Sequence, residues 1–136
     1  MNAILNEDFE NILKEDLAWE KFKDAHVLVT GASGMLGSYM TGVLLKLNEQ
    51  RNYNIRITAL VRHPGKLPDF IRDKVEVLCQ SVTQPIPCDT PYDYVIHTAS
   101  PASPLIMRDD PVGTVAANTL GTFYTLDAAK NSNAKG

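Results

Sequence analysis

A glycine-rich turn between a short apolar run and a helical pattern places the tightest limit on what this chain can fold into. The turn reads TGASGMLGS and holds Gly31, Gly34 and Gly37. It follows residues 26–30, which we interpret as a buried strand, and precedes apolar residues at helical spacing to about residue 48. In that context the first glycine permits the tight turn, the second lets backbone approach a pyrophosphate, and the third lets the helix pack close to the strand.

The start of the predicted helix is suited to bind an anion. Free N–H groups near residues 33–36, together with a helix dipole of about half a charge, would face the phosphates of a dinucleotide. A glycine-rich turn without a ligand is the alternative interpretation. From this pattern we predict a cofactor-binding turn made of Gly31, Ser33, Gly34, Met35, Leu36 and Gly37.

The rest of the chain alternates strand patterns with helical connections. Further strands are predicted at 54–61, 75–78 and 94–97, and a helix at 111–130 that starts with a proline beside Asp109 or Asp110. This order predicts an α/β fold with a doubly wound parallel sheet in the order 3-2-1-4. Residues 1–23 carry an amphipathic helical lead-in, with Asp16 as a cap for a second short turn, and residues 24–136 form the sheet domain.

Composition excludes several classes of protein. The chain has 136 residues, 44% of them hydrophobic, and a net charge of −3, which fits one folded domain. No apolar run approaches the roughly 20 residues that span a bilayer, and the 13 basic residues are scattered, so we predict neither a membrane nor a nucleic-acid partner. Cys79 and Cys88 are too few for a disulfide framework or a zinc site, so no metal is predicted, and the acidic N-terminus does not resemble a signal peptide. These features favour a cytoplasmic protein.

Three motifs carry a resemblance to a known family. The spacing G-x-x-G-x-x-G, the stretch DYVIHTAS at 93–100 and the stretch NTLGTFYTLDAAK at 118–130 together resemble the extended short-chain dehydrogenase/reductase superfamily. HTASPASP at 97–104 is similar to a stretch of UDP-glucuronate decarboxylases, within the NAD-dependent epimerase/dehydratase branch. The resemblance begins near residue 24. It implies part of a Rossmann-type sheet, NAD as cofactor with NADP as an alternative, a nucleotide-sugar substrate, and a homodimer when the protein is full length.

The same resemblance assigns further cofactor contacts. At the end of the second predicted strand a carboxylate would bind the adenosine ribose, but this chain has Arg62, which stacks on adenine, pairs with a 2′-phosphate, or is an ordinary solvated arginine. Ser81, followed by Val82, stands where the family offers an aspartate to adenine. Ala99 and Ser100 would line the nicotinamide side, and residues 101–103 would approach the sugar nucleotide.

Two polar residues in these motifs have modest expected roles. We interpret His97 as a structural histidine that bonds nearby backbone, and not as a catalytic base. Asn118 resembles an asparagine whose helix orders the interior of the active site, although a packing role fits equally well.

The superfamily's catalytic pair is missing from this chain. Its chemistry uses a tyrosine and a lysine in the pattern Y-x-x-x-K, and no tyrosine here is followed by lysine at that spacing. No catalytic residue is therefore predicted, and we interpret the chain as the inactive N-terminal part of a longer enzyme. For a complete member, the resemblance implies transient oxidation of the sugar at C4. A non-catalytic NAD(P)-binding regulatory module and an NADPH-dependent carbonyl reductase, suggested by ALVRHP at 59–64, remain alternatives.

The predicted strand order has a consequence for stability. Strand 94–97 would lie at an unprotected edge, and one face of the last helix, with Val115, Leu120 and Phe123, would lose part of its cover. We therefore expect the isolated chain to be marginally stable and to self-associate.

Overall fold

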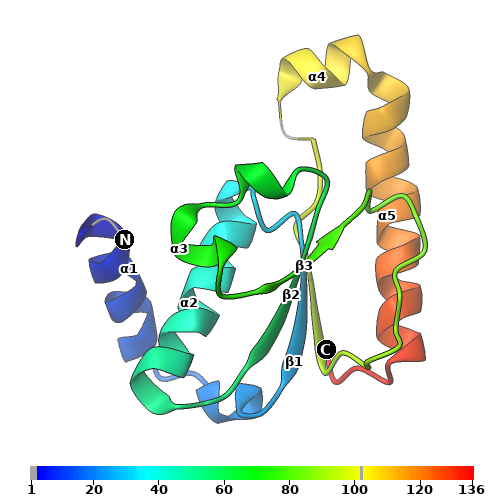
Figure 1. The fold of residues 1–136 in the computed structure, drawn as a ribbon. Helices are drawn as coiled ribbons and strands as arrows, with labels where there is room; N and C mark the ends of the chain where they lie inside the picture. The colour runs from blue at the N-terminus through cyan, green and yellow to red at the C-terminus, as the bar shows by residue number, and fades with distance from the viewer. Residues whose placement is uncertain (1–2, 102) are drawn as a thin grey trace.

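Helices and strands alternate over most of the chain, as the sequence pattern predicts, although the last two strands follow each other without a helix between them (Figure 1). The structure, a computed structural model, describes residues 3–101 and 103–136. Two short 3-10 helices lie at Trp19–Phe22 and Pro64–Lys66. The other elements in chain order are α1 Ala3–Lys14, β1 His26–Thr30, α2 Met35–Arg51, β2 Arg56–Val61, α3 Asp69–Arg72, β3 Glu76–Cys79, β4 Tyr94–His97, α4 Pro104–Asp109 and α5 Pro111–Asn131.

The four strands form one parallel sheet in the order β3-β2-β1-β4, which confirms the predicted fold class and strand order. The central strand β1 pairs with β2 and with β4, so that Val27 lies between Ile57 and Tyr94. All five residues of β1 are buried. Because a central parallel strand is buried on both faces, its sequence is a nearly continuous run of apolar residues and not an alternation of apolar and polar ones.

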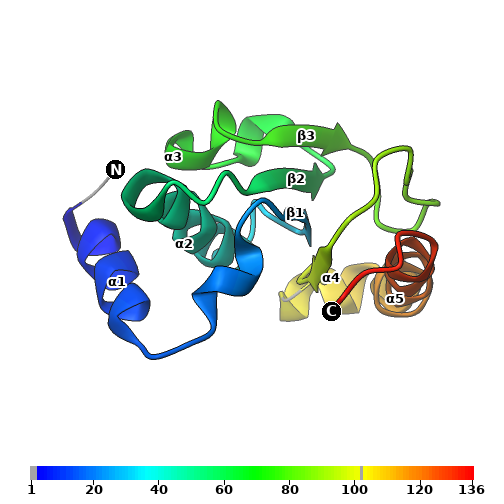
Figure 2. The ribbon, with the colours of Figure 1, turned by 90° about the horizontal axis from the view of Figure 1, so that it is seen from below.

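Helices cover both faces of the sheet (Figure 2). Because side chains alternate along a strand, Val27 and Val29 of β1 face α1 and α2, whereas Leu28 faces the other way. Leu28 packs in a second core with Leu60 of β2 and Ala128 of α5. Each face therefore has its own hydrophobic core, as a doubly wound sheet requires.

The N-terminal helix is part of the first core. Phe9 of α1 is fully buried, and its ring lies edge-on against Tyr39 and tilted against Phe70. Gly42, in the middle of α2, makes room for it, since a Cβ at that position would overlap the Phe9 ring. The two predicted helical segments of this region are present, but the predicted cap is wrong: the turn at 19–22 begins after Ala18, with no side-chain cap.

The edge strand β4 is only partly covered, and the expectation of an unprotected edge needs correction. The N–H of Lys135 donates to the carbonyl of Asp93 (2.8 Å), and the N–H of Val95 donates to the carbonyl of Gly136 (2.9 Å). The Asp93 carboxylate also accepts from the N–H of His26 and pairs with the Lys135 ammonium, at 2.9 Å each, and these bonds lower the pKa of Asp93. The start of β4 is thus bonded on both sides, whereas His97 at its end is exposed.

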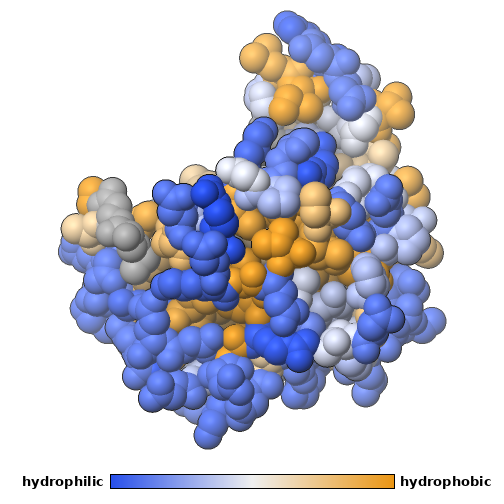
Figure 3. Space-filling model, in the orientation of Figure 1, coloured by the Kyte–Doolittle hydropathy of each residue, from blue (hydrophilic) through white to orange (hydrophobic). Residues whose placement is uncertain are grey.

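Helix α5 contacts the sheet through small residues. Its buried positions are Gly121, Thr125 and Ala128. The opposite face is apolar and exposed, as predicted for Val115, Leu120 and Phe123, and it also holds Val112 and Leu126. Figure 3 shows further apolar surface on the projecting α4, where Leu105, Ile106 and Met107 are exposed.

Candidate functional site

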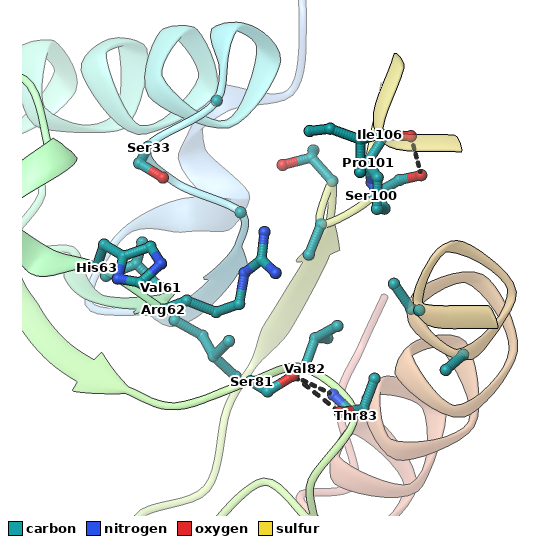
Figure 4. Close-up of a pocket in the computed structure, with 18 of the residues that line it drawn as sticks. Ser33, Val61, Arg62, His63, Ser81, Val82, Thr83, Ser100, Pro101 and Ile106 are labelled. Carbon is teal, nitrogen blue, oxygen red and sulfur yellow. Dashed lines mark hydrogen bonds between the residues drawn. The ribbon is translucent and has the colours of Figure 1, made fainter. Parts of the chain in front are cut away.

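A cavity of about 430 Å³ lies at the carboxyl ends of the strands (Figure 4). In open parallel sheets ligands bind at this edge, where the strand order reverses, because the loops there point away from the sheet in opposite directions. Each strand is followed by a segment that lines the cavity, and α4 and α5 close one side. The principal lining residues are Gly31, Ser33 and Gly34 after β1, Arg62, His63 and Lys66 after β2, Ser81, Val82 and Thr83 after β3, Thr98, Ala99, Ser100 and Pro101 after β4, and Ile106, Asp110, Gly113, Ala116 and Ala117 of the α4–α5 region.

The cavity brings together most of the residues that the sequence predicts for a cofactor site. Those that line it are Gly31, Ser33, Gly34, Arg62, Ser81, Val82, Ala99 and Ser100. The side chains of Met35 and Leu36 are exposed instead (75% and 59%), and Gly37 is buried beneath Gly31. None of these three residues lines the cavity, and what they offer to a ligand there is their backbone N–H groups.

Two of the three turn glycines are required by the protein itself. Gly31 has φ of +69°, and a Cβ there would lie 2.8 Å from the backbone of Ala99. A Cβ at Gly37 would overlap the carbonyl oxygen of Gly31 and lie 2.8 Å from Oγ1 of Thr98. These glycines let the first turn of α2 pack directly against the ends of β1 and β4.

Gly34 is different, because the protein does not by itself demand a glycine there. Its φ is −80°, and an added Cβ would meet only the carbonyl oxygen of Gly31, at 3.2 Å. Gly34 lines the cavity, so the space beside it is space that a ligand can occupy. This bare stretch of backbone fits the close approach of a pyrophosphate.

Unpaired amides stand next to Gly34. The first hydrogen bond into α2 runs from the N–H of Ser38 to the carbonyl of Gly34 (2.9 Å). In the part of the chain that the structure describes, no protein acceptor takes the N–H groups of Met35, Leu36 or Gly37. Together with the positive end of the helix dipole they form a site for an anion.

The segment after β3 shapes another wall. Oγ of Ser81 lies 2.8 Å from Oγ1 of Thr83 and accepts from the Thr83 N–H at 3.2 Å (Figure 4). Val82 is buried against Gly121 of α5, where a Cβ would lie 2.9 Å from the valine. The serine is therefore held by a local turn beside the cavity.

The segment after β4 is fixed by β1. Oγ1 of Thr98 donates to the carbonyl of Thr30 (2.7 Å), and Oγ1 of Thr30 accepts from the N–H groups of Thr98 and Ala99 at 3.2 and 3.3 Å. Ser100 donates to Oδ1 of Asn118 in α5 at 2.9 Å, so Asn118 positions a residue of the cavity wall. Of residues 101–103, Pro101 lines the cavity and Ala102 lies outside the described residues.

His97 bonds side-chain hydroxyls and not the backbone that the sequence analysis proposed. Its Nδ1 lies 2.8 Å from Oγ1 of Thr30 and 3.3 Å from Oγ1 of Thr125. Because the Thr30 oxygen already accepts from two amides, its hydrogen is available to donate to Nδ1, which favours the neutral imidazole. Although the residue as a whole is exposed, burial of the ring lowers the pKa of His97 below its ordinary value of 6.5.

We predict that lowering the pH through this range destabilises the fold by way of His97. The unfolded chain binds the proton more readily than the folded one, so this contribution is fully present above about pH 6.5 and is lost as the pH falls through the lower folded pKa. Urea unfolding at about pH 7.5 and about pH 5.5 measures the loss. It should be smaller in His97→Gln, and an equal loss in both proteins contradicts the prediction.

Sequence reasoning missed several lining residues. His63 and Thr98 lie within two residues of the ends of predicted strands, and Lys66 and Thr83 lie five residues beyond such ends, so position after a strand is the signal that could have found them. The part of the cavity formed by Ile106 depends on α4, which the sequence analysis did not predict.

Most of the chain matches one known protein family. The NAD dependent epimerase/dehydratase family matches residues 27–135. The chain is 30% identical over 110 residues to UDP-glucuronic acid decarboxylase 6 of Arabidopsis thaliana, a match that covers 80% of this chain and 31% of the relative. For UDP-glucuronic acid decarboxylase 1 of Danio rerio the identity is 27%, over 80% of this chain and 25% of the relative. The chain thus spans about a third or less of the length of these relatives.

Solved structures share the fold. The enzyme WbmF of Bordetella bronchiseptica, in complex with NAD+, superposes with a TM-score of 0.62 at 24% identity, covering 81% of this chain and 33% of that one. An epimerase of Methanothermobacter thermautotrophicus gives a TM-score of 0.66 at 20% identity, covering 97% of this chain and 36% of that one.

No helix in the described part of the chain combines the length and the apolar character that crossing a membrane requires.

Proposed function

Since the chain belongs to the NAD dependent epimerase/dehydratase family, whose model matches residues 27–135, we propose that it is the cofactor-binding part of a nucleotide-sugar epimerase, dehydratase or decarboxylase. The observation that carries the proposal is the cavity at the carboxyl ends of the strands, with bare backbone at Gly34 and unpaired amides beside it. The similarity to UDP-glucuronic acid decarboxylases supports a nucleotide-sugar substrate for the whole protein.

Each wall of the cavity has a role in this proposal. The amides of Met35, Leu36 and Gly37 bind the pyrophosphate, as in other helix N-termini that hold phosphate groups. Ser33 and Arg62 lie on the adenosine side, with Ser81 and Val82 beside the adenine. Ala99 and Ser100 border the nicotinamide, and Asn118 holds the serine in place.

The chemistry of the whole protein follows from the cofactor and from a base outside this chain. NAD, when bound, supplies a hydride acceptor for C4 of the sugar. The residues of this chain bind and orient the cofactor, and the proposal assigns none of them to proton transfer at the substrate. In this reading residues 1–23 are a helical lead-in, residues 24–136 are the N-terminal part of the Rossmann domain, and the protein is cytoplasmic.

The coding sequence beyond residue 136 tests the proposal directly. A continuing reading frame that contains a tyrosine and a lysine in the pattern Y-x-x-x-K supports it. A stop codon, or continuation into unrelated sequence, contradicts it. Dinucleotide binding by a protein that ends there would instead favour the non-catalytic regulatory module.

The two enzyme classes differ in whether the cofactor is consumed. In a sugar epimerase or decarboxylase the hydride returns to the sugar, whereas a carbonyl reductase uses one NADPH for each turnover. The absorbance of added NADPH during incubation with small carbonyl compounds therefore separates them. Steady loss of absorbance favours the reductase.

We also propose that the full-length protein forms a homodimer through the outer face of α5. Val112, Val115, Phe123 and Leu126 lie on the side opposite the small residues that face the sheet, and each is at least 60% exposed. A helix that is apolar on both sides is usually buried on both. A second copy of the same helix is the occupant that the proposal assigns to this face.

The double variant Phe123→Glu/Leu126→Glu is expected to be monomeric. Each buried apolar side chain contributes about 1.5–3 kcal/mol, so losing two from each protomer removes about 6 kcal/mol or more and raises the dimer dissociation constant at least about 10⁴-fold. Sedimentation velocity of the full-length protein measures this change. Lys23→Glu alters the net charge by the same amount outside this face of α5 and should leave the dimer intact. A monomeric wild-type protein contradicts the proposal.

A further inference from the structure

Three basic side chains gather at the part of the cavity that follows β2. Arg62, His63 and Lys66 all line it, and all three are exposed to solvent. In Figure 4 the guanidinium group of Arg62 extends into the space between Ser33 and Ser81. His63 lies on the Ser33 side of the same space. The hydroxyl and the basic groups thus border one part of the cavity.

The charge of this cluster is not neutralised by the protein. Across residues 3–101 and 103–136, the ion pairs involve other cations, such as Arg56 with Glu76 and Arg72 with Asp69. Asp110 is the one carboxylate among the described lining residues, and its Oδ1 accepts the N–H of Gly113 at the start of α5 (2.8 Å). The side chains of Arg62 and Lys66 have no acidic partner within the described residues.

These basic residues contrast with the carboxylate that binds a ribose without a 2′-phosphate in other dinucleotide sites. A carboxylate at the end of the second strand accepts hydrogen bonds from the ribose hydroxyls and repels a phosphate there, whereas an arginine accommodates a 2′-phosphate. Here β2 ends at Val61, Arg62 and His63 follow it directly, and Lys66 is the last residue of the 3-10 helix Pro64–Lys66. No acidic residue stands in that segment.

We propose that Arg62, His63 and Lys66 bind a phosphate on the 2′-oxygen of the adenosine ribose, so that this member of an NAD-dependent family binds NADP more tightly than NAD. The proposal rests on the proposed function, because it places the adenosine half of a dinucleotide beside β2. The planar guanidinium of Arg62 provides two parallel hydrogen bonds to phosphate oxygens, and Lys66 adds a second positive charge. The hydroxyl of Ser33, on the facing turn, can donate a further hydrogen bond.

The alternative role of Arg62 is stacking on the adenine ring. Stacking acts on NAD and NADP alike, since both carry the same base, whereas phosphate binding acts on NADP alone. The two roles therefore predict different patterns of affinity across one pair of ligands. Electrostatic contact with a phosphate also weakens as salt rises, which stacking does not require.

Isothermal titration calorimetry of the purified protein with NAD+ and with NADP+ tests the proposal. We expect NADP+ to bind more tightly, and Arg62→Gln to lose about tenfold to hundredfold of NADP+ affinity while NAD+ affinity stays nearly unchanged. Arg62→Asp should reverse the preference. Lys130→Gln removes one positive charge from the exposed end of α5, outside the cavity, and should change neither affinity.

Each other outcome has a definite meaning. Equal losses of both affinities in Arg62→Gln assign the arginine to stacking and overturn the phosphate subsite. Tighter binding of NAD+ by the wild-type protein overturns it as well. Failure of both dinucleotides to bind, with the fold intact by circular dichroism, overturns the proposed function itself and not only this inference.

Discussion

Replacing Gly34 by valine is expected to lower the affinity for NAD at least about hundredfold, a loss of about 2.7 kcal/mol or more. The reason is steric. Gly34 lines the cavity, and a branched side chain there would occupy the place that we propose for the pyrophosphate, next to the free amides of α2. The fold should survive, because φ of −80° suits any residue and the added Cβ would lie 3.2 Å from a single backbone oxygen.

A matched control is available in the same part of the chain. Gly65→Val makes the same change at a residue that does not itself line the cavity, where a Cβ would meet nothing within 4 Å. Calorimetry with NAD+ on both variants, with circular dichroism as a check of folding, measures the effect. An unchanged affinity in Gly34→Val would remove the phosphate-site assignment.

The second large effect is expected at Phe9. Phe9→Ala should lower the free energy of unfolding by about 3–5 kcal/mol, as for other fully buried aromatic residues, out of a total of about 5–15 kcal/mol for a domain. The variant leaves a cavity between α1 and α2, next to Tyr39 and Phe70. Urea denaturation measures the loss, and Ile4→Ala, which truncates a side chain that is 65% exposed, is the control.

A substitution at Gly42 provides a second test of the contact between α1 and α2. In an ordinary helix interior, glycine to alanine stabilises by about 1 kcal/mol. Here Gly42→Ala should destabilise, because the new methyl group would overlap the Phe9 ring. In the double variant the methyl group enters the space that Phe9 vacates, so the two losses should not add. Additive effects would show that α1 does not pack on α2 through this contact.

The strands and the long helices could be read from the sequence because their signals are local. The strands at 26–30 and 94–97 have the predicted bounds, since each is a largely apolar run that ends where turn residues follow. The last helix begins at Pro111 as predicted, and Asp110 caps it through the N–H of Gly113. The helices α3 and α4 are too short to show a period, although Pro104 at the first position of α4 is a usable signal.

The parts of the candidate site that carry a sequence motif could be predicted. The parts that depend on contacts between residues far apart in the sequence could not. The glycine turn and the segment after β4 carry motifs, and the structure brings Gly34 and Ser100 to one cavity. Nothing local reveals that His97 meets Thr30 and Thr125, because strand pairing and helix packing bring those hydroxyls together. The same holds for Gly42, whose neighbour Phe9 lies on another helix.

The position of β1 at the centre of the sheet sets a sequence of events during synthesis. The ribosome delivers the N-terminal segments first, at about 5–20 residues per second. Strand β1 can therefore pair with β2, and the core around Phe9 can close, before Tyr94 of β4 has been made. Leu28 and Leu60 stay at least partly open to water until Ala128 of α5 arrives. The nascent chain thus carries its glycine-rich turn long before the opposite wall of the cavity, and its uncovered sheet face is where a chaperone would be needed.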